Sequence, residues 1–432
     1  MKKWLSFLII FIFIAIAFLF NPVLKQGYAQ NEKKIKLAGV IRGSGTPNFL
    51  GGASWVDVSG NYAYVIGYYD NSLSVFDITD PSKPFLVKSI KVDAYPDMEY
   101  GALSVFVSGN YAYVYHDSGV ILIYDISDVA GKGPDLKSKI EIGPLKGYLD
   151  FKAEEGVADG YVFVQGILAY TVDEVSAALK IIDVSDVSAP VIVSSISGSG
   201  APNYLGNPHW VTVKGDYAYV GTGDEDALSI FNVKDPKKPV LVSAIKGAGA
   251  PNHLDDVDSI FLYKNHIFVA AAYEAALTII DVSNPANPVF RGSISGKDSS
   301  NYLEDVIDVK VVNDYAFLSA YTDTAISAYD VSDVTKPVLA DVVKGTGKPN
   351  YLKGVNIMDI SGNYLYAVSM EDNALVIFDI SDFTQGSGSS DTSATSETTV
   401  GTEGETATTG TTNNGNVSIL RQWLRIHNPN SI

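Results

Sequence analysis

The chain has 432 residues, of which 49 are acidic and 31 are basic, and its formal net charge at neutral pH is −18. A surface this acidic repels nucleic acid and anionic lipid, so the composition argues against both as partners. The sequence contains no cysteine, which excludes disulfide bonds and thiol chemistry.

The chain begins with the features of a secretory signal. Met1-Lys2-Lys3 precedes an apolar run from Leu5 to Phe20, and Gly27-Tyr28-Ala29 supplies the small residues of a cleavage site. We predict a signal peptide at residues 1–29, a linker at 30–36 and an extracytoplasmic protein, either secreted or at the cell surface. An uncleaved membrane anchor is the alternative, because the run approaches the length of a membrane span. Cleavage would remove three lysines and no acidic residue, leaving a net charge of −21.

A repeated segment then organises most of the chain. Ser-Gly-Asn-Tyr-Ala-Tyr-Val at 59–65 occurs seven times with variations, at intervals of 49, 50, 56, 49, 49 and 49 residues. We place its tyrosine position at Tyr62, Tyr111, Tyr161, Tyr217, His266, Tyr315 and Tyr364. A second marker, such as Phe-Asp-Ile-Thr-Asp at 76–80, follows each copy by about fifteen residues. A period of this length with strand-like units indicates a solenoid or a propeller.

Each unit has the pattern of four short strands joined by turns. In the first unit these strands are residues 55–58, 62–68, 73–78 and 85–90, which are rich in Val, Ile, Tyr and Phe and bounded by Gly, Asn, Asp and Pro. The strands are apolar on both faces, as expected for sheets that pack between neighbouring sheets. We therefore predict an all-β fold, a seven-bladed β-propeller with four-stranded blades, over residues 37–385.

The two ends of the repeat region predict how the ring closes. The last unit lacks a fourth strand, because the chain enters Gly-Ser-Gly-Ser-Ser at 386–390 where that strand is due. Residues 37–43 align instead with residues 339–345, the fourth strand of the preceding unit. We predict that this N-terminal strand completes the last blade, so that a monomeric ring closes without an exposed sheet edge.

These residues resemble the LVIVD-repeat family of secreted or surface proteins of bacteria and archaea. The resemblance covers all seven units through Gly-Asn-Tyr-Ala-Tyr-Val, the Asp-(Ile/Val)-Ser-Asp turn and Pro-Val-Leu-Val at 239–242. Units two and three depart from the pattern around Tyr95-Pro96 and within 146–160, and the loop proline of unit two is displaced to Pro134. The resemblance implies a fold and no particular activity, because the family is defined by its repeat.

The loops between one blade's outer strand and the next blade's inner strand are predicted to surround the channel mouth. Five of them share the motif Pro/Ser-Asn-aromatic-Leu. One interpretation is structural, with Asn capping a turn, Leu packing inward and the aromatic residue covering its neighbour. The other is a ligand-binding ring that stacks on a glycan or a peptide. Its candidate residues, together with a tryptophan that follows one motif, are Phe49, Tyr204, Trp210, His253, Tyr302 and Tyr351.

Acidic residues that differ between the units follow these motifs in units four to six. Carboxylate oxygens suit Ca²⁺, and an added imidazole makes a transition metal possible. The alternative is a solvated acidic rim on an acidic protein. The candidate metal ligands are His209, Asp255, Asp256, Asp258, Glu304, Asp305 and Asp308.

The sequence holds no motif of a known catalytic centre. It has no Gly-x-Ser-x-Gly elbow and no EF-hand loop, and the aspartates of the second marker, such as Asp77, are predicted to cap turns on the opposite face. We expect a binding or scaffold propeller that engages a protein or a glycan at the channel mouth. A metal-dependent hydrolase or lyase at the mouth, and a passive surface module, are the alternatives.

The C-terminal region differs in composition from the repeats. Residues 386–416 are almost entirely Ser, Thr, Gly, Ala, Glu and Asn, which predicts a disordered spacer. Residues 417–432 are apolar again but too short to span a bilayer, so contact with a membrane would require this segment or an uncleaved N-terminal anchor.

Overall fold

The computed structural model describes residues 33–93, 101–143, 160–296 and 300–385. The chain divides into two compact units, Met1–Lys34 and Ile35–Ile432, and the second contains every strand named below. The predicted signal, the spacer and the C-terminal segment lie outside the described residues. In the part of the chain that the structure describes, no helix is both long enough and apolar enough to cross a bilayer.

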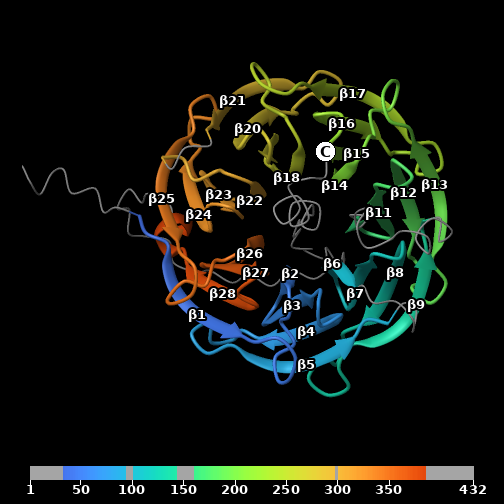
Figure 1. Cartoon of the computed structure of the whole chain (residues 1–432). Coiled ribbons are helices and arrows are strands. Elements are labelled where there is room, and N and C mark those ends of the chain that lie inside the picture. The colour runs from blue at the N-terminus through green and yellow to red at the C-terminus, as the bar shows by residue number, and fades with distance from the viewer. Residues whose placement is uncertain (1–32, 94–100, 144–159, 297–299, 386–432) are drawn as a thin grey trace, which may run out of the picture. The chain divides into compact units, whose positions relative to one another are not determined.

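Seven antiparallel four-stranded sheets surround a common axis, which confirms the predicted propeller (Figure 1). From the innermost strand outward, the first three blades are β2 (Ala53–Ser59), β3 (Tyr62–Gly67), β4 (Ser72–Asp77), β5 (Phe85–Lys91); β6 (Ala102–Ser108), β7 (Tyr111–His116), β8 (Val120–Asp125), β9 (Asp135–Glu141); and β10 (Gly160–Gln165), β11 (Leu168–Asp173), β12 (Ala178–Asp183), β13 (Val191–Ser197). Blades four and five are β14 (Pro208–Lys214), β15 (Tyr217–Thr222), β16 (Ala227–Asn232), β17 (Val240–Lys246); and β18 (Val257–Tyr263), β19 (His266–Ala271), β20 (Ala276–Asp281), β21 (Val289–Ser295). Blades six and seven are β22 (Val306–Val312), β23 (Tyr315–Ala320), β24 (Ala325–Asp330), β25 (Val338–Lys344); and β26 (Val355–Ser361), β27 (Tyr364–Ser369), β28 (Ala374–Asp379), β1 (Lys36–Arg42).

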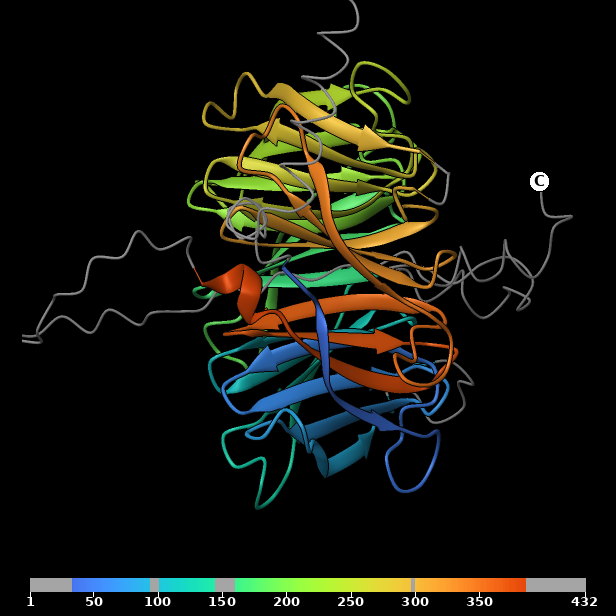
Figure 2. The same ribbon diagram turned by 90° about the vertical axis from the view of Figure 1, so that its left-hand side faces the viewer.

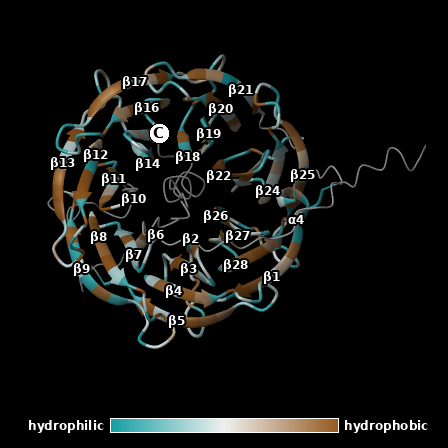
Figure 3. Ribbon diagram, turned by 180° about the vertical axis from the view of Figure 1, so that it is seen from behind, coloured by the Kyte–Doolittle hydropathy of each residue, from teal (hydrophilic) through white to brown (hydrophobic). Residues whose placement is uncertain are grey.

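The middle strands of each blade are buried on both faces. In β3, Ala63 and Val65 on one face have no exposed surface, and Tyr64 on the other is 3 % exposed. Side chains on both faces of the strand are buried because every sheet packs between two others. Successive residues are therefore all apolar, and apolar residues do not alternate with polar ones. Figure 3 shows these strands as mostly hydrophobic ribbons.

The N-terminal strand closes the ring as predicted. β1 pairs with β28 from Lys36 opposite Asp379 to Arg42 opposite Ala374. Figure 2 shows β1 in blue beside the orange-red strands of blade seven. Gly39 lies in this strand where the chain approaches blade one so closely that a Cβ atom would stand 2.1 Å from the carbonyl oxygen of Pro81. A side chain at this position would therefore force the two segments apart.

A short helix, α4 (Ser381–Thr384), follows β28 and packs on blade six. The buried ring of Phe383 packs on Tyr315 and Phe317, with ring centroids 5.1 and 5.3 Å apart. Asn313 donates hydrogen bonds from its amide to the carbonyl oxygens of Phe383 (3.1 Å) and Thr384 (2.8 Å). The chain is therefore fixed to the ring until close to the end of its described part.

The predicted phase of the third unit is wrong. Tyr161 is not the first residue of a second strand but lies in β10, the innermost strand of blade three, and it is fully buried. The position that we assigned to it belongs to Leu168, which begins β11. Tyr161-Val162-Phe163 is similar in sequence to the repeated Tyr-Ala-Tyr-Val segment. Inner and second strands both consist of apolar and aromatic residues, so this similarity led to the wrong prediction.

Candidate functional site on the channel-mouth face

We call the mouth face the end of the ring where each outer strand connects to the next inner strand. In blade one the connecting loop packs on the turn between β3 and β4. There the Asp70 carboxylate accepts hydrogen bonds from the backbone amides of Gly45 (2.9 Å) and Gly51 (2.6 Å). The same carboxylate-to-loop bond recurs in Glu225–Gly200, Glu274–Gly249 and Asp372–Gly347. These acidic residues are therefore occupied in holding the face together.

The repeated Asn-aromatic-Leu motif completes each loop. The Asn48 amide donates to the carbonyl oxygen of Arg42 at 2.6 Å, and Leu50 has no exposed surface. In the other four copies the Asn amide likewise donates to a backbone carbonyl oxygen and the Leu is likewise buried. The pairs are Asn203 and Leu205, Asn252 and Leu254, Asn301 and Leu303, and Asn350 and Leu352. The Asn and Leu of the motif thus have the structural role that one of our two interpretations gave them.

The aromatic candidates are half-buried and lie over the outer strands of their blades. Their backbones adopt the left-handed conformation, with φ of 53° at Phe49, 51° at Tyr204, 49° at His253, 54° at Tyr302 and 49° at Tyr351. A cation from an outer strand covers one face of three rings, at 4.1, 4.5 and 4.1 Å from the centroid, in the pairs Lys246–Tyr204, Lys344–Tyr302 and Arg42–Tyr351. His253 Nδ1 contacts Glu274 Oε1 at 2.8 Å. Four of the five rings are thus fixed by their own blades.

Three of the seven predicted metal ligands come together at the junction of blades four and five. His209, Asp256 and Asp258 each offer a ligand atom, and these atoms lie within 4.8 Å of one another. The three residues are 1 %, 7 % and 0 % exposed. We refer to them as the His-Asp-Asp cluster.

Strand irregularities place the cluster. His209 and Asp258 occupy the β-bulges at the starts of β14 and β18, where the pairing shifts between Pro208 and Trp210 and between Val257 and Ser259. Asp256 precedes β18 with a φ of 58°. A bulge changes the direction of a side chain. Here the two bulges direct the side chains of His209 and Asp258, from neighbouring inner strands, toward each other.

The other predicted ligands are not part of this cluster. Both carboxylate oxygens of Asp308 contact Lys310 Nζ, at 2.8 and 2.9 Å. Asp305 accepts a hydrogen bond from the Thr322 hydroxyl at 3.1 Å. Asp255 and Glu304 are half-buried in the loops that precede β18 and β22.

Two residues that the sequence did not single out border the His-Asp-Asp cluster. A Cβ atom on Gly223 would stand 2.7 Å from Asp256 Oδ1, 2.8 Å from His209 Cε1 and 3.0 Å from Asn207 Nδ2. Asn207 is 5 % exposed and its Oδ1 atom has no hydrogen-bond partner. Neither residue belongs to a ligand motif, because they come from a loop and a turn that meet only in the folded ring.

The surroundings of the cluster are strongly negative. Asp226, in the turn between β15 and β16, accepts a hydrogen bond from the Asp256 amide at 3.2 Å. Burial raises the pKa of the Asp226 carboxyl, and the neighbouring Asp255 and Asp224 carboxylates raise it further, against the attraction of Lys246. A cation at this junction would therefore be attracted by several carboxylates.

Aromatic side chains from the inner strands of three blades pack on one another. The rings of Trp55 in blade one and Tyr161 in blade three stack with centroids 5.4 Å apart, and the Trp210 ring of blade four lies 5.1 Å from Tyr161. All three are at most 1 % exposed, and Lys310 Nζ lies 5.1 Å from the Trp210 ring. The candidate ligand residue Trp210 is therefore buried among the inner strands and is not exposed on the mouth surface.

A second group of buried charges links blades six, seven, one and two. Carboxylates of the inner strands accept hydrogen bonds from backbone amides of the following blade, in Asp308–Met358 (2.9 Å), Asp359–Val58 (2.8 Å) and Asp57–Val107 (2.6 Å). Burial, followed by the nearby Asp57 carboxylate, raises the pKa of the Asp359 carboxyl well above its ordinary value. Burial also raises the pKa of Asp308, against the attraction of Lys310. These bonds join consecutive blades across the ring closure.

The tips of the turns between the second and third strands differ from blade to blade. Three of them present large apolar or aromatic side chains, which are Tyr69 (54 % exposed), Val175 (47 %) and Tyr273 (40 %). The equivalent tip residues of blades four, six and seven are Asp224, Thr322 and Glu371. These tips are the non-repeating part of the mouth face, and no shared motif in the sequence marks their turns.

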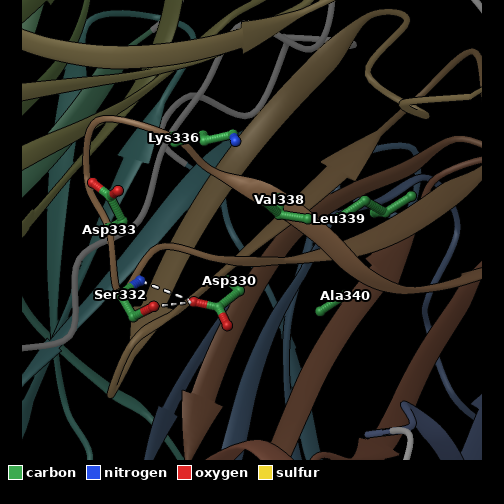
Figure 4. A pocket seen from close by; sticks show the side chains of 7 residues that line it. All are labelled: Asp330, Ser332, Asp333, Lys336, Val338, Leu339 and Ala340. Carbon is green, nitrogen blue, oxygen red and sulfur yellow. Dashed lines mark hydrogen bonds between the residues drawn. The ribbon is translucent and has the colours of Figure 1, made fainter.

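The opposite face carries the predicted turn-capping aspartates. In blade six, Asp330 Oδ1 accepts hydrogen bonds from the backbone amide (3.0 Å) and the hydroxyl (2.7 Å) of Ser332. This turn lines a shallow pocket with Lys336, Val338 and Leu339 (Figure 4). The same cap is formed by Asp77, Asp125, Asp183, Asp281 and Asp379. Because the motif repeats around the ring, the pocket reflects turn structure.

Comparison with protein families identifies the repeat. The model of the LVIVD repeat matches residues 50–92, 101–132, 159–197, 206–246, 255–295 and 356–386, which together make up more than half of the chain. A search of curated proteins finds no match.

Solved structures that resemble the chain share its architecture. They include the computationally designed Ika8 protein, with a TM-score of 0.53, 10 % identity and coverage of 80 % of this chain and 99 % of that one. A chain of the Mitotic Checkpoint Complex has a TM-score of 0.57, 11 % identity and coverage of 81 % and 94 %. A candidate 6-phosphogluconolactonase from Bacteroides fragilis has a TM-score of 0.55, 12 % identity and coverage of 73 % and 96 %. At this identity the likeness shows the propeller fold alone.

Proposed function

The chain belongs to the LVIVD repeat family, and from that premise we propose that it is a secreted or cell-surface propeller that binds a protein partner on its mouth face. The observation that carries the proposal is the exposure of Tyr69, Val175 and Tyr273 on the turn tips of that face. Tyrosine combines a large apolar ring with a polar hydroxyl, and it is enriched where proteins bind one another. Tips that differ between blades suit a partner without sevenfold symmetry.

The mouth-face loops favour a protein over a glycan. A sugar would stack on an open aromatic face, but Tyr204, Tyr302 and Tyr351 each have one face covered by a cation of the same blade. The net charge of −21 after removal of residues 1–29 favours a partner with a basic surface, because complementary charge accelerates association. The extracytoplasmic location in this proposal rests on the signal-like residues 1–29.

The buried side chains give less support to an enzyme at the channel mouth. A catalytic metal needs an open coordination position that substrate can reach. The residues of the His-Asp-Asp cluster are at most 7 % exposed, and the rings of Trp55, Tyr161 and Trp210 pack on one another and are at most 1 % exposed. Binding on the exposed tips is the function that these features support best.

Site-specific photo-crosslinking tests the proposal. A photoreactive residue is placed at position 69, 273 or 85 of the full chain, which is then exposed to the extracellular proteins of the cells that make it. Phe85 in β5 is the matched control, because it is an aromatic residue of similar exposure (56 %) on an outer strand. We expect positions 69 and 273 to capture the same partner and position 85 to capture none.

Affinity measurements with the captured partner then quantify the surface. Tyr273→Ala should weaken binding by about 2 kcal/mol, roughly thirtyfold, as expected for a central interface tyrosine. Phe85→Ala should change the dissociation constant less than about threefold. Equal crosslinking from all three positions, or binding in a glycan array that Tyr69→Ala and Tyr273→Ala abolish, would refute a protein partner at the mouth face.

A further inference from the structure

We propose that His209, Asp256, Asp258 and Asn207 form a site for one divalent transition-metal ion, Mn²⁺ or Zn²⁺, between blades four and five. The site goes beyond the proposed partner binding and does not depend on it. Its first support is convergence, because three ligand atoms from two inner strands and one loop lie within 4.8 Å of one another. Two carboxylates and an imidazole match the charge and the ligand preference of such an ion.

The imidazole is oriented for coordination. His209 Nδ1 lies 3.1 Å from the carbonyl oxygen of Val257, which can only accept a hydrogen bond, so Nδ1 carries the proton. Nε2 then carries the lone pair that a metal ion requires. A backbone carbonyl that fixes the tautomer in this way is the usual outer-shell partner of a metal-binding histidine.

Asn207 provides an independent indication of a ligand. The residue is only 5 % exposed, so it is more than nine-tenths buried. Its Oδ1 atom has no hydrogen-bond partner. Its amide borders the same space beside Gly223 as the Asp256 carboxylate and the His209 ring. A half-turn of the amide group would direct Oδ1 into that space. A buried amide oxygen without a partner is costly unless something binds it, and a cation would satisfy it together with the carboxylates.

Gly223 leaves the space that an ion would need. The residue has no Cβ, and an added one would stand 2.7 Å from Asp256 Oδ1, in the middle of the proposed ligands. Gly223→Ala therefore blocks the site without removing any ligand or charge. The alternative to a metal site is an imidazolium that pairs with Asp258, whose Oδ1 lies 3.3 Å from His209 Nδ1.

Metal titration of the full chain tests the proposal. Protein stripped with chelator and dialysed is titrated with Mn²⁺ by electron paramagnetic resonance and with Zn²⁺ by calorimetry. We expect one ion per chain, and an increase in the melting temperature on binding because the ion binds only the folded state. His209→Gln and Gly223→Ala should each weaken binding by at least about tenfold. Asp224→Asn, an exposed carboxylate on the same turn as Gly223, should leave affinity within about twofold.

A spectroscopic measurement on the unaltered protein keeps the test decisive if a variant fails to fold. Bound Mn²⁺ should show a ¹⁴N coupling from the His209 ring by electron–nuclear double resonance. The proposal is overturned by stoichiometric binding without that coupling, by equal affinity in the unaltered and Gly223→Ala chains, or by no binding at millimolar ion. The last result would leave the imidazolium–carboxylate pair as the explanation of the cluster.

Discussion

Two groups of buried charges lie on the inner strands, and they differ in the source of their positive charge. In the group that runs from blade six to blade two, Asp308, Asp359 and Asp57 share the interior with the ammonium of Lys310. In the group between blades four and five, Asp256 and Asp258 lie beside the imidazole of His209. Both groups are at least nine-tenths buried, so both need compensation.

The difference follows from how the side chains reach each group. Asp308 and Lys310 are two residues apart in β22, so they point to the same side of one strand and pair directly. His209 and Asp258 come from bulges in separate strands, and their ligand atoms lie within 4.8 Å of each other. One arrangement makes an ion pair within the chain, and the other resembles a coordination sphere.

Removing the internal cation should have the largest effect. Lys310→Met leaves the buried carboxylates of blades six to one without their counter-charge, and we expect a loss of about 3–5 kcal/mol in the free energy of unfolding, measured with urea. Lys264→Met is the control, because that side chain is 64 % exposed and its ammonium pairs with Asp314 at 3.5 Å. It should cost less than about 1 kcal/mol. Similar losses in the two variants would show that Lys310 does not compensate the group.

The two groups should respond differently to loss of one carboxylate. In chelator-treated protein, Asp308→Asn leaves the Lys310 ammonium without its partner and should cost about 3 kcal/mol. Asp258→Asn removes the repulsion between Asp258 and Asp256, so it should change stability by about 1 kcal/mol or less. Urea denaturation of both variants measures the contrast. A larger loss from Asp258→Asn would mean that the blade four–five group holds an essential internal ion pair.

A smaller effect concerns the pH dependence of Asp359. Its folded pKa is raised above the ordinary value of 3.8 by burial and by Asp57, so the folded state favours the protonated carboxyl. The stability of the unaltered chain relative to Asp359→Asn should therefore be highest near pH 4 and fall as pH rises towards the folded pKa, as followed by urea denaturation at several pH values.

Asp183 provides a control of opposite sign. Hydrogen bonds from the hydroxyl and the amide of Ser185 lower the pKa of this half-buried carboxyl. The advantage of the unaltered chain over Asp183→Asn should be present above pH 4 and decrease as pH falls below it. Parallel pH profiles for the two variants would contradict a raised pKa for the buried Asp359 carboxyl.

The repeat made most of the fold predictable. The period, the strand runs and the missing strand of the last unit depend on local residues, so the closing strand and the capping role of Asp77 were identified correctly. Blade three was misassigned because Tyr161-Val162-Phe163 has the local character of either strand. Only packing on Trp55 and Trp210 makes it an inner strand.

The candidate site was less predictable, because it depends on contacts between blades. Acidic residues near β18 and β22 looked equivalent in the sequence, yet Asp258 joins His209 whereas Asp308 pairs with Lys310. Nothing in the spacing of these residues indicates which neighbouring blade each side chain meets. Asn207 and the exposed Tyr69 lie outside any shared motif, so only their positions in the ring make them noticeable.

The pairing of β1 with β28 has a consequence for the order of events during protein synthesis. Lys36 and Asp382, which form an ion pair at 2.8 Å beside these strands, are 346 residues apart in the chain. At a synthesis rate of about 5–20 residues per second, β28 is made roughly 20–70 seconds after β1. Blades one to six are made during that delay and can assemble as a growing arc. Joining the newest strand to the oldest is therefore the last step in making the ring.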